Sequence, residues 1–154
     1  EKAQQALANG CTHTINYRLE DVAARVHDIT SGQGVDVVLD TVGKDTFAAS
    51  LKSLRRRGLM VCAGTSSGPV PPLDPQTLAR HGSLFLTRPA LADYIAEPSE
   101  KAALLDALFT GLRAGWLRAD IGQRYELAEA ARAHRELEAR QTTGASIFVL
   151  ADDR

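Results

Sequence analysis

Two short turns that contain glycine are the positions best suited to hold a ligand through their backbone. One is Thr41-Val42-Gly43, directly after the apolar run 35–39, and the other is Ala63-Gly64-Thr65, at the end of the apolar run 59–63. Because glycine has no Cβ, a ligand can approach the main chain closely at these points. Parallel sheets bind ligands just beyond the carboxyl ends of their strands. Each turn is therefore a candidate binding turn, a tight strand-to-helix connection, or both.

Side chains that could act as nucleophiles or metal ligands form no recognisable constellation. Ser66 and Ser67 lie in a Gly-, Ser- and Pro-rich loop over 64–75, but the sequence has no GxSxG elbow and no evident His/Asp set, which argues against a serine hydrolase. The four histidines share no metal-ligand spacing, and His134 is expected to pack in the core. Cys11 and Cys62 lack a CxxC spacing and are expected to be small packed residues in a reducing, cytoplasmic setting.

The composition is that of an ordinary globular protein. The 154 residues include 18 Lys and Arg against 19 Asp and Glu, and this net charge of −1 favours neither nucleic acid nor an anionic membrane as a partner. Hydrophobic residues make up 44% and charged residues 24%. No apolar run approaches the ~20 residues that cross a bilayer, and no signal peptide opens the sequence.

Helical and strand patterns alternate in the first part of the chain. Residues 2–9 favour a helix that Gly10 ends, and a second helix is expected over 21–29 with Asp21 near its start. Strands are expected at 12–15, 35–39, 59–63 and 83–87, and a helix from residue 47 is expected to end at the three arginines 55–57. Short apolar runs separated by helices indicate a parallel sheet covered on both faces. The predicted fold class is α/β, doubly wound.

The pattern changes after Pro89, so we place a domain boundary near residue 90. A helix over 99–113 with Ser99 as its N-cap is expected to bury four leucines, Leu104, Leu105, Leu108 and Leu112. An extended stretch, a helix over 128–139 and a final strand over 146–150 follow.

Several runs occur in a fixed order: GVDVVLDTVGKDTF, LRRRGLMVCAGTSSGPV, HGSLFLTRPAL and AARAHRELEAR…GASIFVL. This order resembles the quinone oxidoreductase (zeta-crystallin-like) branch of the medium-chain dehydrogenase/reductase superfamily over essentially the whole chain. The resemblance implies a partial Rossmann-like sheet, with residues 1–90 as the later part of an NADP-binding domain and residues 91–154 as the C-terminal part of the catalytic (substrate) domain. The GxGxxG phosphate loop of that family is absent, so the resemblance implies that these residues alone lack a complete active site.

The resemblance also implies a reaction and a set of cofactor contacts. A hydride would pass from NADPH to a quinone or other conjugated carbonyl acceptor without zinc, and none of these residues would be catalytic. Lys2, Tyr17 and Arg140 occupy the positions of family residues that bind the 2′-phosphate of NADPH. The turn 41–43 would lie beside the adenosine and ribose, and the turn 63–65 beside the nicotinamide. Arg88 would lie at the domain junction.

Two other functions remain open. One is an enoyl-reductase relative that reduces carbon–carbon double bonds of acyl thioesters. The other is a non-catalytic nucleotide-binding module that retains the fold without the phosphate loop. The apolar strand 83–87 corresponds to an edge strand that pairs between two subunits in the family, so a cytoplasmic homodimer is expected.

Overall fold

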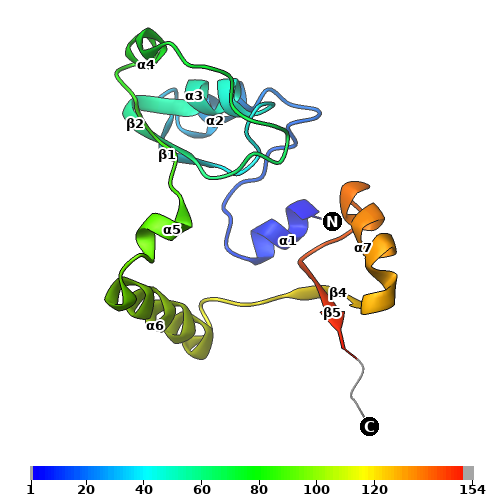
Figure 1. Cartoon of the computed structure of the whole chain (residues 1–154). Coiled ribbons are helices and arrows are strands. Elements are labelled where there is room, and N and C mark those ends of the chain that lie inside the picture. The colour runs from blue at the N-terminus through cyan, green and yellow to red at the C-terminus, as the bar shows by residue number, and fades with distance from the viewer. Residues whose placement is uncertain (1, 151–154) are drawn as a thin grey trace. The chain divides into compact units, whose positions relative to one another are not determined.

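The computed structural model describes residues 2–150 and contains two units (Figure 1). The first unit runs from Ala3 to Tyr94, and the second begins at Ile95 and includes Lys2. Elements of the first unit are α1 (Lys2–Ala8, from Ala3 onward), α2 (Val22–Ile29), β1 (Val35–Asp40), α3 (Phe47–Ser53), β2 (Leu54–Cys62), α4 (Pro75–Arg80), β3 (Phe85–Thr87) and α5 (Leu91–Tyr94). The second unit contains α6 (Pro98–Ala114), β4 (Ile121–Glu126), the 3₁₀ turn η1 (Leu127–Glu129), α7 (Ala130–Glu138) and β5 (Ala145–Val149). Among residues 2–150, no helix has the length and apolar character needed to span a bilayer.

The first unit is built on a parallel sheet, which confirms the α/β prediction. Its strands lie in the order β1-β2-β3, and both neighbouring pairs are parallel. Val38 of β1 is in register with Met60 of β2, which is in register with Leu86 of β3. β1 and β3 are therefore the two edge strands, and the carboxyl ends of all three strands lie at one edge of the sheet.

One face of this sheet carries the core. Met60 is completely buried, and Phe47 and Leu51 of α3 are buried against the same cluster. The opposite face is open, because Val37 is 53% exposed and its register neighbour two strands away, Phe85, is 62% exposed. The prediction of cover on both faces therefore holds for only one face within residues 2–150. The strands are apolar on both sides, and the pattern alone could not tell which side this chain covers.

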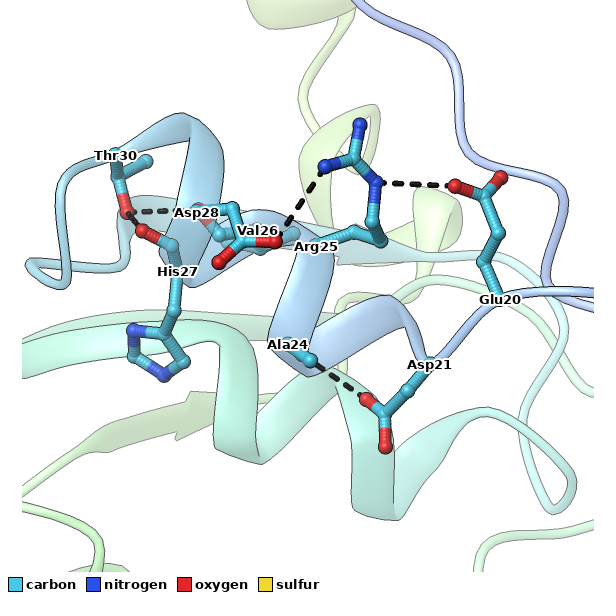
Figure 2. Close-up of polar contacts among 8 residues, drawn as sticks. All are labelled: Glu20, Asp21, Ala24, Arg25, Val26, His27, Asp28 and Thr30. Atoms are coloured by element: carbon cyan, nitrogen blue, oxygen red, sulfur yellow. Dashed lines mark hydrogen bonds and ion pairs between the residues drawn. The ribbon is translucent and has the colours of Figure 1, made fainter.

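Polar side-chain contacts stabilise the short helix α2 and fix its start (Figure 2). Asp21 is its N-cap, and the Asp21 carboxylate accepts a hydrogen bond of 2.9 Å from the Ala24 N–H. Arg25 forms ion pairs with Glu20 at 3.0 Å and Asp28 at 3.4 Å. This start was expected from the sequence and is confirmed.

The end of α1 was also predicted correctly. Gly10 has a φ of +100°, its N–H donates to the Leu7 carbonyl at 3.1 Å, and the Cys11 N–H donates to the Ala6 carbonyl at 3.0 Å. These two bonds form a Schellman motif, in which glycine is favoured at the left-handed position.

Two predictions in the first unit are wrong. Residues 12–15 form no strand, because no described strand lies beside them to share hydrogen bonds. Thr12, His13 and Ile15 instead line a cavity of about 430 Å³ together with Val26, Ile29 and Val35. The helix that begins at Phe47 ends at Ser53, so residues 54–57 belong to β2 rather than to a helix. The backbone becomes extended at Leu54, with φ −79° and ψ 143°, and Leu54 is in register with Val35 of β1.

The second unit contains a parallel strand pair, β4 with β5, and its packing involves Tyr125. Tyr125 is 3% exposed, its hydroxyl donates to the Glu136 carboxylate at 2.6 Å, and the Arg132 guanidinium lies 4.8 Å from the centre of its ring. Hydrogen bonding to Glu136, together with burial, raises the pKa of Tyr125. These contacts connect α7 to β4.

Three predictions for this unit are wrong. The N-cap of α6 is Glu97 rather than Ser99, because Pro98 occupies the first helical position, where its missing N–H costs nothing. The four leucines of α6 are 38–49% exposed instead of buried, since no described element covers that side of the helix. His134 is exposed, and Ala133 is the buried residue of α7.

The two cysteines differ in environment. Cys62 is buried in the core, as expected, whereas Cys11 is exposed, which contradicts the expectation that it would be packed.

Candidate functional site

The two predicted binding turns lie against each other at the carboxyl edge of the sheet. The N–H groups of Ala63 and Gly64 donate to the Asp40 carbonyl at 2.7 and 3.1 Å. A Cβ on Gly64 would lie 2.1 Å from the Thr41 carbonyl oxygen, and one on Gly43 would lie 2.6 Å from the Gly68 carbonyl oxygen. The absence of a Cβ at these glycines therefore allows close contact between backbone segments. From the sequence, the same absence was interpreted as room for a ligand.

Asp40 organises the first turn through its buried carboxylate. One oxygen accepts hydrogen bonds from the Val42 and Gly43 N–H groups, both at 2.9 Å, and the other accepts from the Ser50 hydroxyl at 2.8 Å. The Thr46 hydroxyl lies within 2.9 Å of both oxygens. Burial alone raises the pKa of Asp40, but the hydrogen bonds outweigh burial and hold the pKa below its usual value. Asp40 therefore remains an anion that fixes the shape of this turn.

Asp40 was missed in the sequence, although a signal was present. An aspartate that follows an apolar strand and precedes Thr-Val-Gly has the spacing of a side chain that accepts from N–H groups two and three residues ahead. The carboxylate sits at the end of β1, directly below the turn that the sequence singled out.

The loop after β2 is attached to the same turn by Ser67. The Ser67 N–H and hydroxyl both donate to the Val42 carbonyl at 2.9 Å, and the hydroxyl accepts from the Asp45 N–H at 3.0 Å. Ser66 is exposed, and its hydroxyl lies 3.4 Å from the Thr41 carbonyl. Both serine hydroxyls thus lie near backbone carbonyls, and the expectation that neither is a nucleophile stays a prediction.

Tyr17 shares a pocket with residues that follow the first turn. The pocket has a volume of about 230 Å³ and lies between the segment before α2 and the start of α3. Its lining residues are Tyr17, Glu20, Asp21, Val22, Asp45, Thr46 and Ala49. The structure therefore places Tyr17, one predicted phosphate residue, close to the start of α3, and none of residues 41–43 lines this pocket.

A second, more apolar pocket opens beside the carboxyl ends of β2 and β3. Its volume is about 340 Å³, and it is lined by Phe47, Cys62, Thr65, Pro69, Val70, Pro71, Leu73, Leu86 and Arg88. The Arg88 guanidinium donates to the Pro89 carbonyl at 3.0 Å. Burial and the negative charge of Asp40 raise the pKa of the Cys62 thiol, with Arg88 opposing them, so this thiol stays neutral. The lining is mostly apolar, and Arg88 is its charged residue.

Two of the predicted phosphate residues meet in the second unit. The Lys2 ammonium donates a hydrogen bond of 3.1 Å to the backbone carbonyl of Arg140. Arg140 follows α7 at a φ of +59°, where its N–H donates to the Leu137 carbonyl at 3.0 Å. This bond brings the Lys2 ammonium to the backbone of Arg140, and a role of the two cationic side chains in binding a phosphate stays a prediction. Tyr17 belongs to the first unit, and the shared role of the three residues stays a prediction.

Within residues 2–150, no group of three or more His, Cys, Asp or Glu side chains lies close enough together to hold a metal ion.

Comparison with known proteins gives consistent matches over nearly the whole chain. The zinc-binding dehydrogenase family profile matches residues 9–147. A quinone oxidoreductase from Pseudomonas aeruginosa is 46% identical over 149 residues, which cover 97% of this chain and 46% of that protein. A 2-haloacrylate reductase from a Burkholderia species is 43% identical over 150 residues, covering 97% of this chain and 45% of that protein.

A solved structure agrees with these matches. The crystal structure of Escherichia coli quinone oxidoreductase complexed with NADPH matches with a TM-score of 0.90 at 44% sequence identity, covering 96% of this chain and 46% of that one. The chain thus spans about half the length of the curated relatives it matches.

Proposed function

The chain belongs to the zinc-binding dehydrogenase family, and on this premise we propose that it is part of an NADPH-dependent quinone oxidoreductase. In this proposal the chain binds the cofactor and does not supply a catalytic group. The observation that carries the proposal is the pair of turns, 41–43 and 63–65, joined at the carboxyl edge of a parallel sheet. This is the edge where open α/β sheets hold nucleotides.

We expect NADPH to contact the chain at three places. The pocket beside Tyr17, together with the first turn, would take the adenosine end, while the second turn would contact the nicotinamide end through its backbone. Lys2 and Arg140 would bind the 2′-phosphate, since an ammonium and a guanidinium together favour a dianion. When bound, NADPH supplies the hydride that reduces the acceptor. The chain contributes orientation of the cofactor.

The acceptor is proposed to be a quinone or another conjugated carbonyl compound. The apolar pocket between Thr65 and Arg88 supports this choice, because it would accept a flat ring and present a guanidinium to a carbonyl oxygen. We propose that the transfer needs no zinc, and metal analysis of the active full-length protein, together with its activity after treatment with a chelator, tests that point.

A specific observation favours a second acceptor class. A relative of comparable similarity is named a 2-haloacrylate reductase, so an unsaturated carboxylate is a second candidate acceptor, with Arg88 as the partner of its carboxylate. Turnover of the full-length protein with a quinone and with 2-chloroacrylate, each with NADPH, separates the two classes. Turnover of an acyl thioester would instead support the enoyl-reductase alternative.

Cofactor binding is tested by titrating NADPH and NADH into the full-length protein and following nicotinamide fluorescence. We expect tighter binding of NADPH, a preference reduced in Lys2→Ala and unchanged in Lys101→Ala, an exposed lysine of α6. Equal affinity for the two cofactors would contradict the phosphate site. If neither cofactor binds, the non-catalytic module becomes the better interpretation.

We also propose a cytoplasmic homodimer that forms through β3. The cytoplasmic part of this proposal rests on the sequence, in which two cysteines without a CxxC spacing are typical of a reducing compartment. β3 is an edge strand and exposes Phe85, a combination typical of a strand that pairs with another. Leu84 is 6% exposed and belongs to the core, so it is a poor site for probing this interface, whereas Phe85 is a good one. Light scattering of Phe85→Lys is the test.

A further inference from the structure

The Ser67 hydroxyl adds to the backbone hydrogen bonds that join the loop after β2 to the turn after β1. Main-chain bonds already connect the two segments, from the Ser67 N–H to the Val42 carbonyl at 2.9 Å and from the Lys44 N–H to the Gly68 carbonyl at 3.2 Å. The hydroxyl adds a second bond to Val42 at 2.9 Å and accepts one from the Asp45 N–H at 3.0 Å. It therefore holds the turn on both sides of Gly43.

The neighbouring serine lacks this role. Ser66 has the same side chain one residue earlier, yet it is exposed, and its hydroxyl lies 3.4 Å from the Thr41 carbonyl. Ser67 is half-buried, with both hydrogen-bonding functions of its hydroxyl in use. The two serines form a natural pair in which one hydroxyl connects the turns and the other contributes little.

We propose that Ser67 is a positioning residue that fixes the spacing between the turns 41–43 and 63–65. The proposal rests on the proposed function, in which one turn contacts the adenosine end of NADPH and the other contacts the nicotinamide end. If a cofactor is held at both ends, a change in the distance between the turns moves its reacting carbon. Hydride transfer is sensitive to such movement, because a displacement of the reacting atoms by about 1 Å can lower the rate roughly a hundredfold.

The experiment compares Ser67→Ala with Ser66→Ala in the full-length protein. Three quantities are measured: the dissociation constant of NADPH by nicotinamide fluorescence, kcat with a quinone, and the primary isotope effect with NADPH deuterated at C4. For Ser67→Ala we expect kcat to fall roughly tenfold, a larger isotope effect, and NADPH affinity within about threefold of wild type. Ser66→Ala should match wild type in all three, and Ser67→Thr, which keeps the hydroxyl, should recover most of kcat.

Each outcome decides the question. Equal kcat and isotope effects for the two alanine variants would overturn the proposal while leaving the proposed function intact. A loss of kcat that Ser67→Thr does not recover, accompanied by a lower melting temperature, would make Ser67 merely structural and would also overturn it. If Ser67→Ala does not fold, Ser67→Cys replaces it, because a thiol forms weaker hydrogen bonds than a hydroxyl. The kcat of Ser67→Cys is then expected to lie between the kcat of wild type and one tenth of that value. A wild-type protein without NADPH-dependent turnover would show that the proposed function itself had failed.

Discussion

Replacing Arg140 by glycine should stabilise the fold and weaken NADPH binding at the same time. Arg140 occupies the left-handed position of the Schellman motif that ends α7, with the Gln141 N–H donating to the Glu136 carbonyl at 2.9 Å. The same motif at the end of α1 uses Gly10. A residue with a Cβ costs about 1–2 kcal/mol in this conformation, while glycine loses roughly 0.5–1 kcal/mol more backbone entropy on folding. The net gain for Arg140→Gly is about 0.5–1 kcal/mol.

Function should change in the opposite direction. The variant removes the guanidinium but keeps the carbonyl to which the Lys2 ammonium donates, so Lys2 stays in place. Hydrogen bonds to charged groups contribute about 1.5–3 kcal/mol, which corresponds to a loss of NADPH affinity of roughly ten- to a hundredfold. NADH has no 2′-phosphate, so its affinity should not change.

Ser31 provides a matched control for this variant. It lies at the left-handed position after α2 with a φ of +52°, and the following Gly32 N–H donates to the His27 carbonyl at 2.7 Å. Ser31→Gly should give a similar gain in stability, a rise in melting temperature of roughly 1–4 °C, with no change in cofactor preference. Thermal melting and fluorescence titration of both variants in the full-length protein provide the test. If Arg140→Gly preserved the NADPH preference as fully as Ser31→Gly, Arg140 would not belong to the phosphate site.

Three further predictions concern the sheet and its turns. Asp40→Ala should lower the free energy of unfolding by roughly 2–4 kcal/mol, since four donors lose a buried acceptor. Because folding lowers the pKa of Asp40, the stabilising effect of its carboxylate should be complete above the unfolded pKa of 3.8 and should disappear as the pH falls through the folded pKa. Acid titration of the stability of wild type and of Asp40→Asn would measure this effect. Gly64→Ala should prevent correct folding, because its Cβ would overlap the Thr41 carbonyl, whereas Gly115→Ala, with nothing within 4 Å, should cost only about 1–2 kcal/mol through its φ of +77°; circular dichroism of the two variants distinguishes these effects. Phe85→Lys should keep the melting temperature and shift light scattering toward the monomer, and a dimer that survived this change would place the interface elsewhere.

Local signals in the sequence predicted the elements that depend on local contacts. Asp21 and Gly10 marked helix ends correctly, since capping involves only residues a few positions away. The apolar runs before Thr41 and Gly64 correctly gave parallel strands. These features need no knowledge of distant partners.

Several of the failures share one physical cause, which is dependence on neighbours that the local sequence does not specify. The β-branched run at 12–15 has strand propensity, but a strand exists only when another strand shares its hydrogen bonds. The leucines of α6 have the spacing of a buried face, but the described residues place nothing over them. The bonds of Ser67 to Val42 and Asp45 join residues more than twenty positions apart, so no local pattern could have singled out Ser67 over Ser66.

The open edge of β1 has a practical consequence for anyone who produces this polypeptide by itself. Val37 and Leu39 are 53% and 66% exposed, on a strand whose outer edge has no partner among the described residues. Unpaired apolar edges recruit strands from other molecules and lead to aggregation. We expect the 154-residue chain expressed in isolation to precipitate as its concentration rises, and a lysine at Val37 to delay this. The same substitution should lower the stability of any longer protein in which this edge is covered. A lysine at this position therefore improves the solubility of the isolated chain but weakens the assembly of the longer protein.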